Sequence, residues 1–123
     1  MLAYRLLVVA GTFALSLPAS AQDAGHGKML FEQCAACHSV EASHNGVGPS
    51  LHGVFGRKVA SIDDFVYSPP FRRASFTWTS EALDRFLADP QAGQFRGNKM
   101  PFSGMPDAKE RADLIAYLVD ATK

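Results

Sequence analysis

The sequence predicts a single all-α domain with three main helices connected by loops. Apolar residues recur at helical intervals in three stretches, residues 28–37, 79–89 and 107–119. Capping residues, glycines or a proline mark the ends of these stretches. No run of alternating apolar and polar residues is long enough to predict a β-sheet. The length of 123 residues fits one domain.

The first 21 residues have the pattern of a secretory signal peptide. Residues 1–5 carry a positive charge, residues 6–17 are almost wholly apolar, and Ala19-Ser20-Ala21 matches an A-x-A cleavage site. The apolar stretch is shorter than the roughly 20 residues that a bilayer span needs. We therefore expect cleavage after Ala21, export to the periplasm and a mature domain of residues 22–123. Retention of the segment as an uncleaved anchor is the alternative.

The charge balance argues against nucleic acid as a partner. The chain has 12 basic and 12 acidic residues, and removal of Arg5 with the signal peptide leaves 11 basic residues against 12 acidic ones. Proteins that bind nucleic acid need an excess of basic side chains to neutralise phosphates. The mature chain has no such excess.

The only two cysteines of the chain stand in the pentapeptide Cys34-Ala35-Ala36-Cys37-His38. Two thiols separated by two residues and followed by a histidine are typical of covalent c-type haem attachment. Each thiol can add to one haem vinyl group, which places the imidazole that follows beside the iron. We therefore predict one haem c attached through Cys34 and Cys37, with His38 as the proximal iron ligand.

Two other chemistries use similar cysteine pairs. A redox-active disulfide is typical of a βαβ unit with a strand before the first cysteine, whereas residues 27–33 have the pattern of a helix start. A zinc site needs four ligands, and the other histidines are scattered at positions 26, 44 and 52. Both interpretations stay open but explain the pentapeptide less well.

The first predicted helix, residues 28–37, carries the cysteine motif at its carboxyl end, so that His38 points inward. Met29 on this helix is expected to be a core residue. Residues 22–25 are expected to form a loose leader before the helix.

The middle of the chain is expected to be mostly irregular. Residues 39–56 contain four glycines and a proline and predict a loop with turns. A short helix is expected after Pro70, because proline suits a first helical turn. The second main helix, residues 79–89, begins with Thr79 as its cap and ends before Pro90.

The last predicted helix begins at Asp107, with Glu110 three residues later in the manner of a capping box. The helical pattern divides its residues into two faces. The predicted buried face consists of Leu114, Ile115, Leu118 and Val119, and the predicted solvent face of Arg111, Asp113 and Asp120.

The sixth iron position decides between electron transfer and the binding of small molecules. Met100 lies in a loop between two helices, far along the chain from His38, and its soft thioether suits ferrous iron. Met29 precedes the haem motif on the first helix and would have to double back. Met105 lies in a similar loop and is the reserve candidate.

Several stretches of the chain resemble the class I c-type cytochromes, the small cytochromes c of mitochondria and bacteria. The resemblance extends over residues 25–123 and rests on the haem motif and on residues 48–58, 76–78, 97–102 and 113–118. It implies the cytochrome c fold, in which helices and loops wrap around one covalently bound haem. It also implies that Phe31 packs against Leu114 and Tyr117.

The resemblance assigns roles to individual residues. It implies that the Pro49 carbonyl accepts a hydrogen bond from His38, and that Met100 is the sixth ligand. It implies that Tyr67 and Trp78 donate to a haem propionate, with Arg57 close by. Phe71 and Phe86 depart from the asparagine and tyrosine usual in mitochondrial proteins, and the basic ring around the haem edge is reduced to Lys28, Arg96 and Lys99.

The implied function is that of a one-electron carrier and not of an enzyme. Such a carrier would be a monomer that moves electrons between larger respiratory or photosynthetic redox proteins, membrane-bound or soluble, which dock at the exposed haem edge. One alternative is a haem peroxidase or gas-binding protein with a labile sixth ligand. Another is a domain held permanently within an oxidase or dehydrogenase complex.

Overall fold

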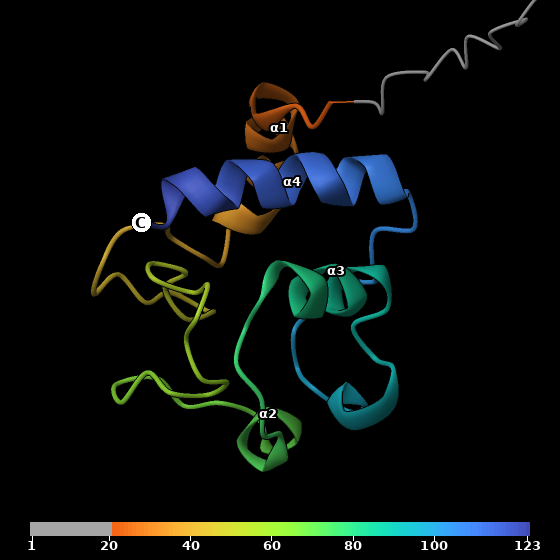
Figure 1. The fold of residues 1–123 in the computed structure, drawn as a ribbon. Coiled ribbons are helices and arrows are strands. Elements are labelled where there is room, and N and C mark those ends of the chain that lie inside the picture. The colour runs from red at the N-terminus through yellow and green to blue at the C-terminus, as the bar shows by residue number, and fades with distance from the viewer. Residues whose placement is uncertain (1–20) are drawn as a thin grey trace, which may run out of the picture.

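The computed structural model describes residues 21–123, and the predicted signal peptide lies outside these residues except for Ala21. The described chain forms four α-helices and one 3₁₀-helix (Figure 1): α1 (Ala24–Ala35), α2 (Pro69–Arg73), α3 (Ser80–Ala88), η1 (Gly93–Phe95) and α4 (Ala108–Ala121). Residues 21–123 contain no strand, only an isolated antiparallel bridge between Lys58 and Thr77. The prediction of an all-α domain with three main helices is confirmed.

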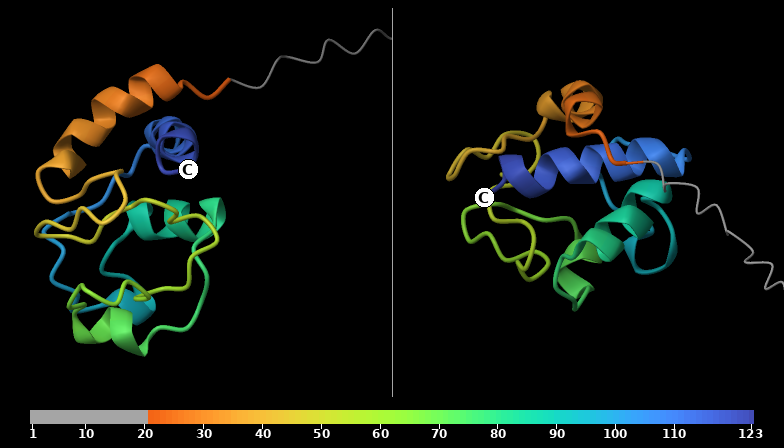
Figure 2. Two further views of the ribbon diagram at one scale, coloured as in Figure 1. Left: turned by 90° about the vertical axis from the view of Figure 1, so that its left-hand side faces the viewer. Right: turned by 45° about the horizontal axis from the view of Figure 1, so that its top comes forward.

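The elements occupy three levels. Helices α1 and α4 pack together at one end of the molecule, α3 packs beneath α4, and α2 lies with η1 at the other end (Figure 2). Figure 1 views α1 nearly end-on and α4 from the side, so these two helices cross instead of running parallel. No helix formed by residues 21–123 is long and apolar enough to cross a membrane.

Capping side chains determine where the helices begin. The Asp23 side chain accepts a hydrogen bond from the His26 amide at 3.0 Å, so α1 begins at Ala24, four residues earlier than predicted. The Thr79 hydroxyl accepts from the Ala82 amide at 3.1 Å, which confirms the predicted start of α3. Asp107 accepts from two amides of the first turn of α4, as its predicted role requires.

The crossing of α1 and α4 depends on a glycine. A Cβ atom at Gly27 would lie 1.9 Å from the carbonyl oxygen of Asp113, so no other residue fits without separating the helices. One turn later, Phe31 lies with its ring centroid 5.5 Å from that of Tyr117 and packs with Leu114 in the core. The packing implied by the family resemblance is confirmed.

Asp113 lies in the core, and its predicted position on the solvent face is wrong. Asp113 is 1% exposed. Its carboxylate accepts hydrogen bonds from the Asp23 amide at 2.8 Å and from Lys109 Nζ at 2.5 Å. His26 Nδ1 lies 2.9 Å from the second oxygen. The hydrogen bond from Lys109, followed by those from His26 and the Asp23 amide, holds the Asp113 pKa far below its usual range. Burial is possible because each oxygen has a partner.

Three further predictions for the helices are wrong. Met29, predicted in the core, is 68% exposed, because α1 turns Gly27 and Phe31 toward α4 and Met29 lies on the opposite side. Val119, predicted on the buried face of α4, is 40% exposed. Arg111, predicted on the solvent face, instead donates from Nε to Asp84 at 2.7 Å and joins α4 to α3.

We predict that Gly27→Ala destabilises the protein by roughly 1–3 kcal/mol or more, because the new methyl group must push α1 away from α4. Thermal unfolding of the purified holoprotein, followed by far-ultraviolet circular dichroism, measures the effect. Gly25→Ala is the matched control on the same helix. Its Cβ would lie 3.3 Å from Asp23 Oδ1, the end of a side chain that can shift, and we expect a change of less than about 1 kcal/mol. Equal effects of the two variants would contradict this account of the crossing.

We predict that Asp113→Asn lowers the unfolding temperature at pH 7, because the amide cannot replace the charge that Lys109 and His26 face. The folded pKa of Asp113 lies below the unfolded value of about 3.9. Its stabilisation is therefore present at neutral pH and is lost as the pH falls below about 4. Unfolding temperatures measured at pH 7 and pH 3 should show the gap between variant and wild type narrowing in acid. Asp120→Asn, an exposed acid on the same helix, should show little effect at either pH.

Candidate functional site

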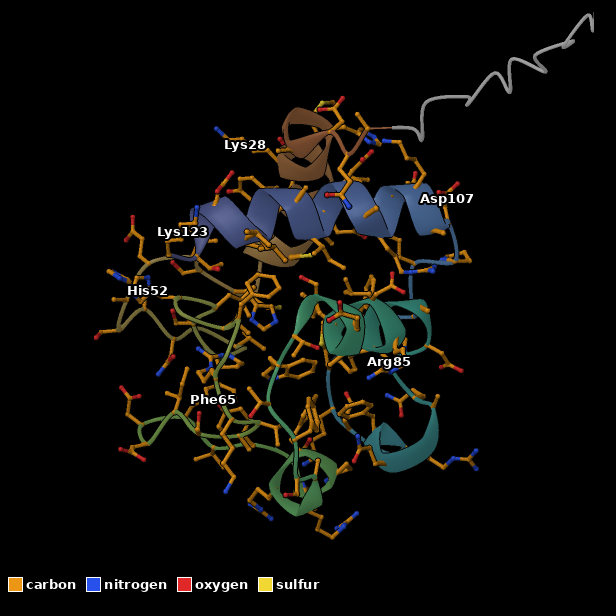
Figure 3. All side chains as sticks on the ribbon, viewed as in Figure 1. Lys28, His52, Phe65, Arg85, Asp107 and Lys123 are labelled. Carbon is orange, nitrogen blue, oxygen red and sulfur yellow. The ribbon has the colours of Figure 1, made fainter. Side chains whose placement is uncertain are left out.

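One cavity of about 340 Å³ lies between α1, α3, α4 and the loops of residues 39–68 and 96–106. Its walls are mostly apolar, as is typical of a small-molecule or cofactor site. All eight predicted site residues line it: Cys34, Cys37, His38, Pro49, Arg57, Tyr67, Trp78 and Met100. In Figure 3, Phe65, another lining residue, marks the loop that closes one side.

The cysteine motif reaches the cavity at the end of α1. The helix ends at Ala35, and the amides of Cys37 and His38 both donate to the Cys34 carbonyl, at 3.1 and 2.9 Å. This turn places both thiols and the imidazole along the cavity wall. No disulfide joins the two cysteines. Burial, together with the neighbouring Cys37, raises the pKa of the Cys34 thiol.

His38 is held in one orientation by the loop that follows it. Its Nδ1 lies 2.7 Å from the Pro49 carbonyl oxygen. A carbonyl oxygen can only accept, so Nδ1 carries the proton and Nε2 is free to bind a metal. Burial lowers the pKa of His38, and the charge of Arg57 acts in the same direction, so the ring stays neutral at pH 7 although the Pro49 carbonyl opposes the shift.

Gly48 has a role that the sequence analysis missed. A Cβ atom at this position would lie 2.5 Å from His38 Cε1, so the imidazole can occupy its place only beside a glycine. In the sequence, Gly48 is one of several loop glycines. Its position directly before Pro49, which accepts from His38, could have indicated that it lies beside the imidazole.

Arg57, Tyr67 and Trp78 are three of the hydrogen-bond donors in the mostly apolar wall. Arg57 Nη1 donates to the carbonyls of Ser50 and His52 at 3.1 and 2.9 Å, and no carboxylate of residues 21–123 forms an ion pair with it. The Tyr67 hydroxyl accepts from the Ile62 amide at 3.3 Å, which leaves its own proton free. Burial lowers the pKa of Arg57, because the guanidinium charge loses contact with water. An anionic group of a ligand beside Arg57 would offset this cost.

Trp78 is the third of these donors. Its ring is buried, and its indole N–H has no hydrogen-bond partner among the described residues. An indole nitrogen is a donor only, so a ligand acceptor is the partner it lacks. Together with Arg57 and Tyr67, it gives the cavity the means to hold an acidic group.

A buried asparagine, which the sequence analysis also missed, holds the loop that carries Met100. Asn98 Oδ1 accepts from the Met100 amide at 2.9 Å, while Nδ2 donates to the carbonyls of Pro90 and Phe95 at 2.7 and 2.9 Å. Asparagine side chains commonly replace backbone partners in irregular segments. This amide fixes the loop relative to the segment after α3.

Met105 does not line the cavity. It is buried in the core cluster that joins α1, α3 and α4, and its amide donates to the Leu87 carbonyl at 2.7 Å. The reserve candidate for the sixth ligand is therefore a packing residue in this structure, whereas Met100 reaches the cavity.

The two positions that depart from the mitochondrial pattern form one aromatic cluster. Phe71 and Phe86 line the cavity with ring centroids 5.8 Å apart, and each packs against Phe95, at 5.6 and 5.0 Å. Trp78 joins them at 5.6 Å from Phe86. Aromatic rings at these separations stabilise each other beyond the area they bury. The cluster makes this wall of the cavity apolar.

These features fit a flat apolar cofactor with acidic substituents, attached through two thiols. Among residues 21–123, no group of three or more histidine, cysteine or acidic side chains could hold a metal ion by itself. The cytochrome c family profile matches residues 24–122.

The chain belongs to the cytochrome c family. It is 42% identical over 118 residues to cytochrome c2 of Blastochloris viridis, a match that covers 95% of this chain and 90% of that protein. It is 49% identical over 88 residues to cytochrome c2 iso-2 of Magnetospirillum fulvum, covering 72% and 91% of the two chains. Cytochrome c of Gibberella zeae is 41% identical over 103 residues, covering 82% and 96%.

Membership of the family gives the cofactor and the general function. This cytochrome c carries one haem, bound covalently through Cys34 and Cys37, and it is an electron carrier, not an enzyme. The sequence predictions of the family, of the cofactor and of a non-enzymatic role are confirmed.

We predict that Asn98→Ala destabilises the holoprotein by about 1–3 kcal/mol, because two buried carbonyls lose their donor. The amide of Met100 also loses its acceptor, so its hydrogen exchange should become faster. Hydrogen exchange followed by mass spectrometry over residues 96–102 measures this. Asn45→Ala is the control, because Asn45 also makes two side-chain hydrogen bonds, but in the loop near Ser50. Unchanged exchange in Asn98→Ala would contradict the role of this amide.

Proposed function

We propose that the chain is exported with residues 1–21 as a cleaved signal peptide, and that residues 22–123 carry single electrons in the periplasm between larger respiratory or photosynthetic redox proteins. The observation that carries the proposal is that His38 and Met100 line the same cavity as the two attachment cysteines. The match to the Blastochloris cytochrome c2 covers 95% of the chain and so extends into the first 21 residues, which supports a shared leader.

His38 through Nε2 and Met100 through its sulfur would hold the haem iron. The bound haem supplies a reversible one-electron change between ferric and ferrous iron. The Pro49 carbonyl keeps the His38 ring in place, and Asn98 keeps the Met100 loop in place. With both ligands fixed, the site changes little between oxidation states, and the barrier to electron exchange is low.

Arg57, Tyr67 and Trp78 are proposed to hold the acidic substituents of the haem. Each offers a donor at the cavity wall, and Arg57 has no carboxylate partner among the described residues. Burying an unpaired charge is costly, so these donors stabilise the bound form. The apolar walls around them exclude water from the iron.

The proposed partners are redox proteins, membrane-bound or soluble, that meet a monomeric carrier at the edge of the cavity. A carrier must release each partner quickly, which favours a small contact area.

We predict that Met100→Leu removes the weak long-wavelength absorption band of sulfur-ligated ferric haem and lowers the reduction potential, because the substitution keeps the volume but removes the sulfur. Absorption spectra and equilibrium redox titrations of the purified protein measure both effects. Met105→Leu should keep the band and the potential, since Met105 lies in the core outside the cavity.

The opposite result, with the band lost only in Met105→Leu, would exclude Met100 as the ligand. A high-spin ferric spectrum of the unmodified protein, with tight cyanide and carbon monoxide binding, would instead support a gas-binding site with a labile sixth ligand.

A further inference from the structure

We propose that the electron-transfer partner contacts this cytochrome through an uncharged, apolar surface and not through an acidic one. The inference rests on the proposed function and specifies the chemistry of the partner. It concerns the rim of the cavity, defined as the four exposed residues that line it: Val47, Val66, Lys99 and Pro101. A partner that exchanges electrons with the haem must approach it over this rim.

Three of the four rim residues are apolar, and two are unusually exposed. Val47 is 76% exposed and Val66 is 86% exposed, and they come from different loops. They are two of only four large hydrophobic side chains that are exposed within residues 21–123. Apolar side chains gathered at a functional opening mark contact surfaces, because covering them removes apolar area from water.

Charge is nearly absent from the cavity and its rim. The described residues include 11 basic and 12 acidic side chains, but only Arg57 and Lys99 line the cavity. Arg57 is half-buried and donates inward to the Ser50 and His52 carbonyls. Lys99 is therefore the single exposed charge on the rim.

The other basic side chains do not line the cavity, although five of them are exposed and form no ion pair within residues 21–123: Lys58, Arg72, Arg73, Arg85 and Arg96. Lys109, Arg111 and Lys123 each form an ion pair with an acidic residue. Lys28 points outward from α1 at the end of the molecule away from Phe65, which lines the cavity (Figure 3). An acidic partner surface would meet little complementary charge at the rim.

A near-neutral rim is complementary to a near-neutral partner. Acidic groups on the partner would lose their water without gaining ion pairs, apart from one opposite Lys99. Contacts to Val47, Val66 and Pro101 cost little side-chain entropy, because valine and proline have few rotamers to lose. Association of this kind depends weakly on salt, since screening acts on charges and not on apolar contact.

Voltammetry on gold electrodes tests the proposal with surfaces of known chemistry. The holoprotein is compared on monolayers of mixed methyl- and hydroxyl-terminated, carboxylate-terminated and ammonium-terminated alkanethiols. We expect the largest electron-transfer rate on the mixed neutral monolayer. That rate should change by less than about twofold up to about 1 M salt, where the Debye length is roughly 3 Å.

The double variant Val47→Glu/Val66→Glu should lower the rate on the neutral monolayer by about tenfold and give a salt-dependent rate on the ammonium-terminated monolayer. Val119→Glu is the matched control, because Val119 is also exposed but lies on α4 outside the cavity. It should leave the rate unchanged. The absorption spectrum of both variants should equal that of the wild type, whereas the reduction potential of the double variant should fall slightly, because two carboxylates beside the haem favour ferric iron.

Three outcomes would overturn the proposal. A preference for the carboxylate monolayer that is lost in salt would show a basic docking surface. A double variant with a changed spectrum but an unchanged rate would show that the valines serve the haem pocket and not the contact. Absence of a reversible one-electron wave on every monolayer would overturn the proposed function as well, whereas a wave with the wrong surface preference overturns only the present inference.

Discussion

The crossing of α1 over α4 is the contact on which the rest of the structure depends. Gly27 brings the α1 backbone against the Asp113 carbonyl, and Phe31 then packs on Tyr117. The same two helices carry functional groups to the cavity, the cysteine motif at the end of α1 and two leucines of α4. The distance between the helices therefore fixes where the attachment cysteines stand relative to the opposite wall. Close packing transmits such a constraint because protein interiors deform little.

The cavity is the missing part of a small core. Residues from both buried clusters of the protein line it, including Leu87 and Leu114 of one and Trp78 and Phe86 of the other. A domain of about one hundred residues buries a limited fraction of its surface, so a flat apolar cofactor contributes much of its core. The irregular segments 39–68 and 96–106 gain a common surface to pack against. Cofactor binding and folding are coupled for this reason, and a covalent tether keeps the cofactor in place.

The sequence predicted the features that are encoded locally, and it missed those that need partners far along the chain. The haem pentapeptide and the loop of Met100 are short motifs, and their residues reach the cavity as expected. Thr79 and Asp107 cap their helices because a cap acts within three residues.

Asp113 shows the limit of such reasoning. From the sequence, a carboxylate on a helix is expected to face solvent. The fold shows that Asp23 and His26, which are 90 and 87 residues away in sequence, form hydrogen bonds with this carboxylate. Met29 was misplaced for a related reason. Both faces of α1 contain apolar residues, and the face that turns inward is chosen by Gly27, whose meaning lies in the missing side chain. Gly27 can contact the backbone of α4 because it has no side chain. A pattern of apolar residues does not register such a contact, so the steric fit with α4 decides which face of α1 turns inward.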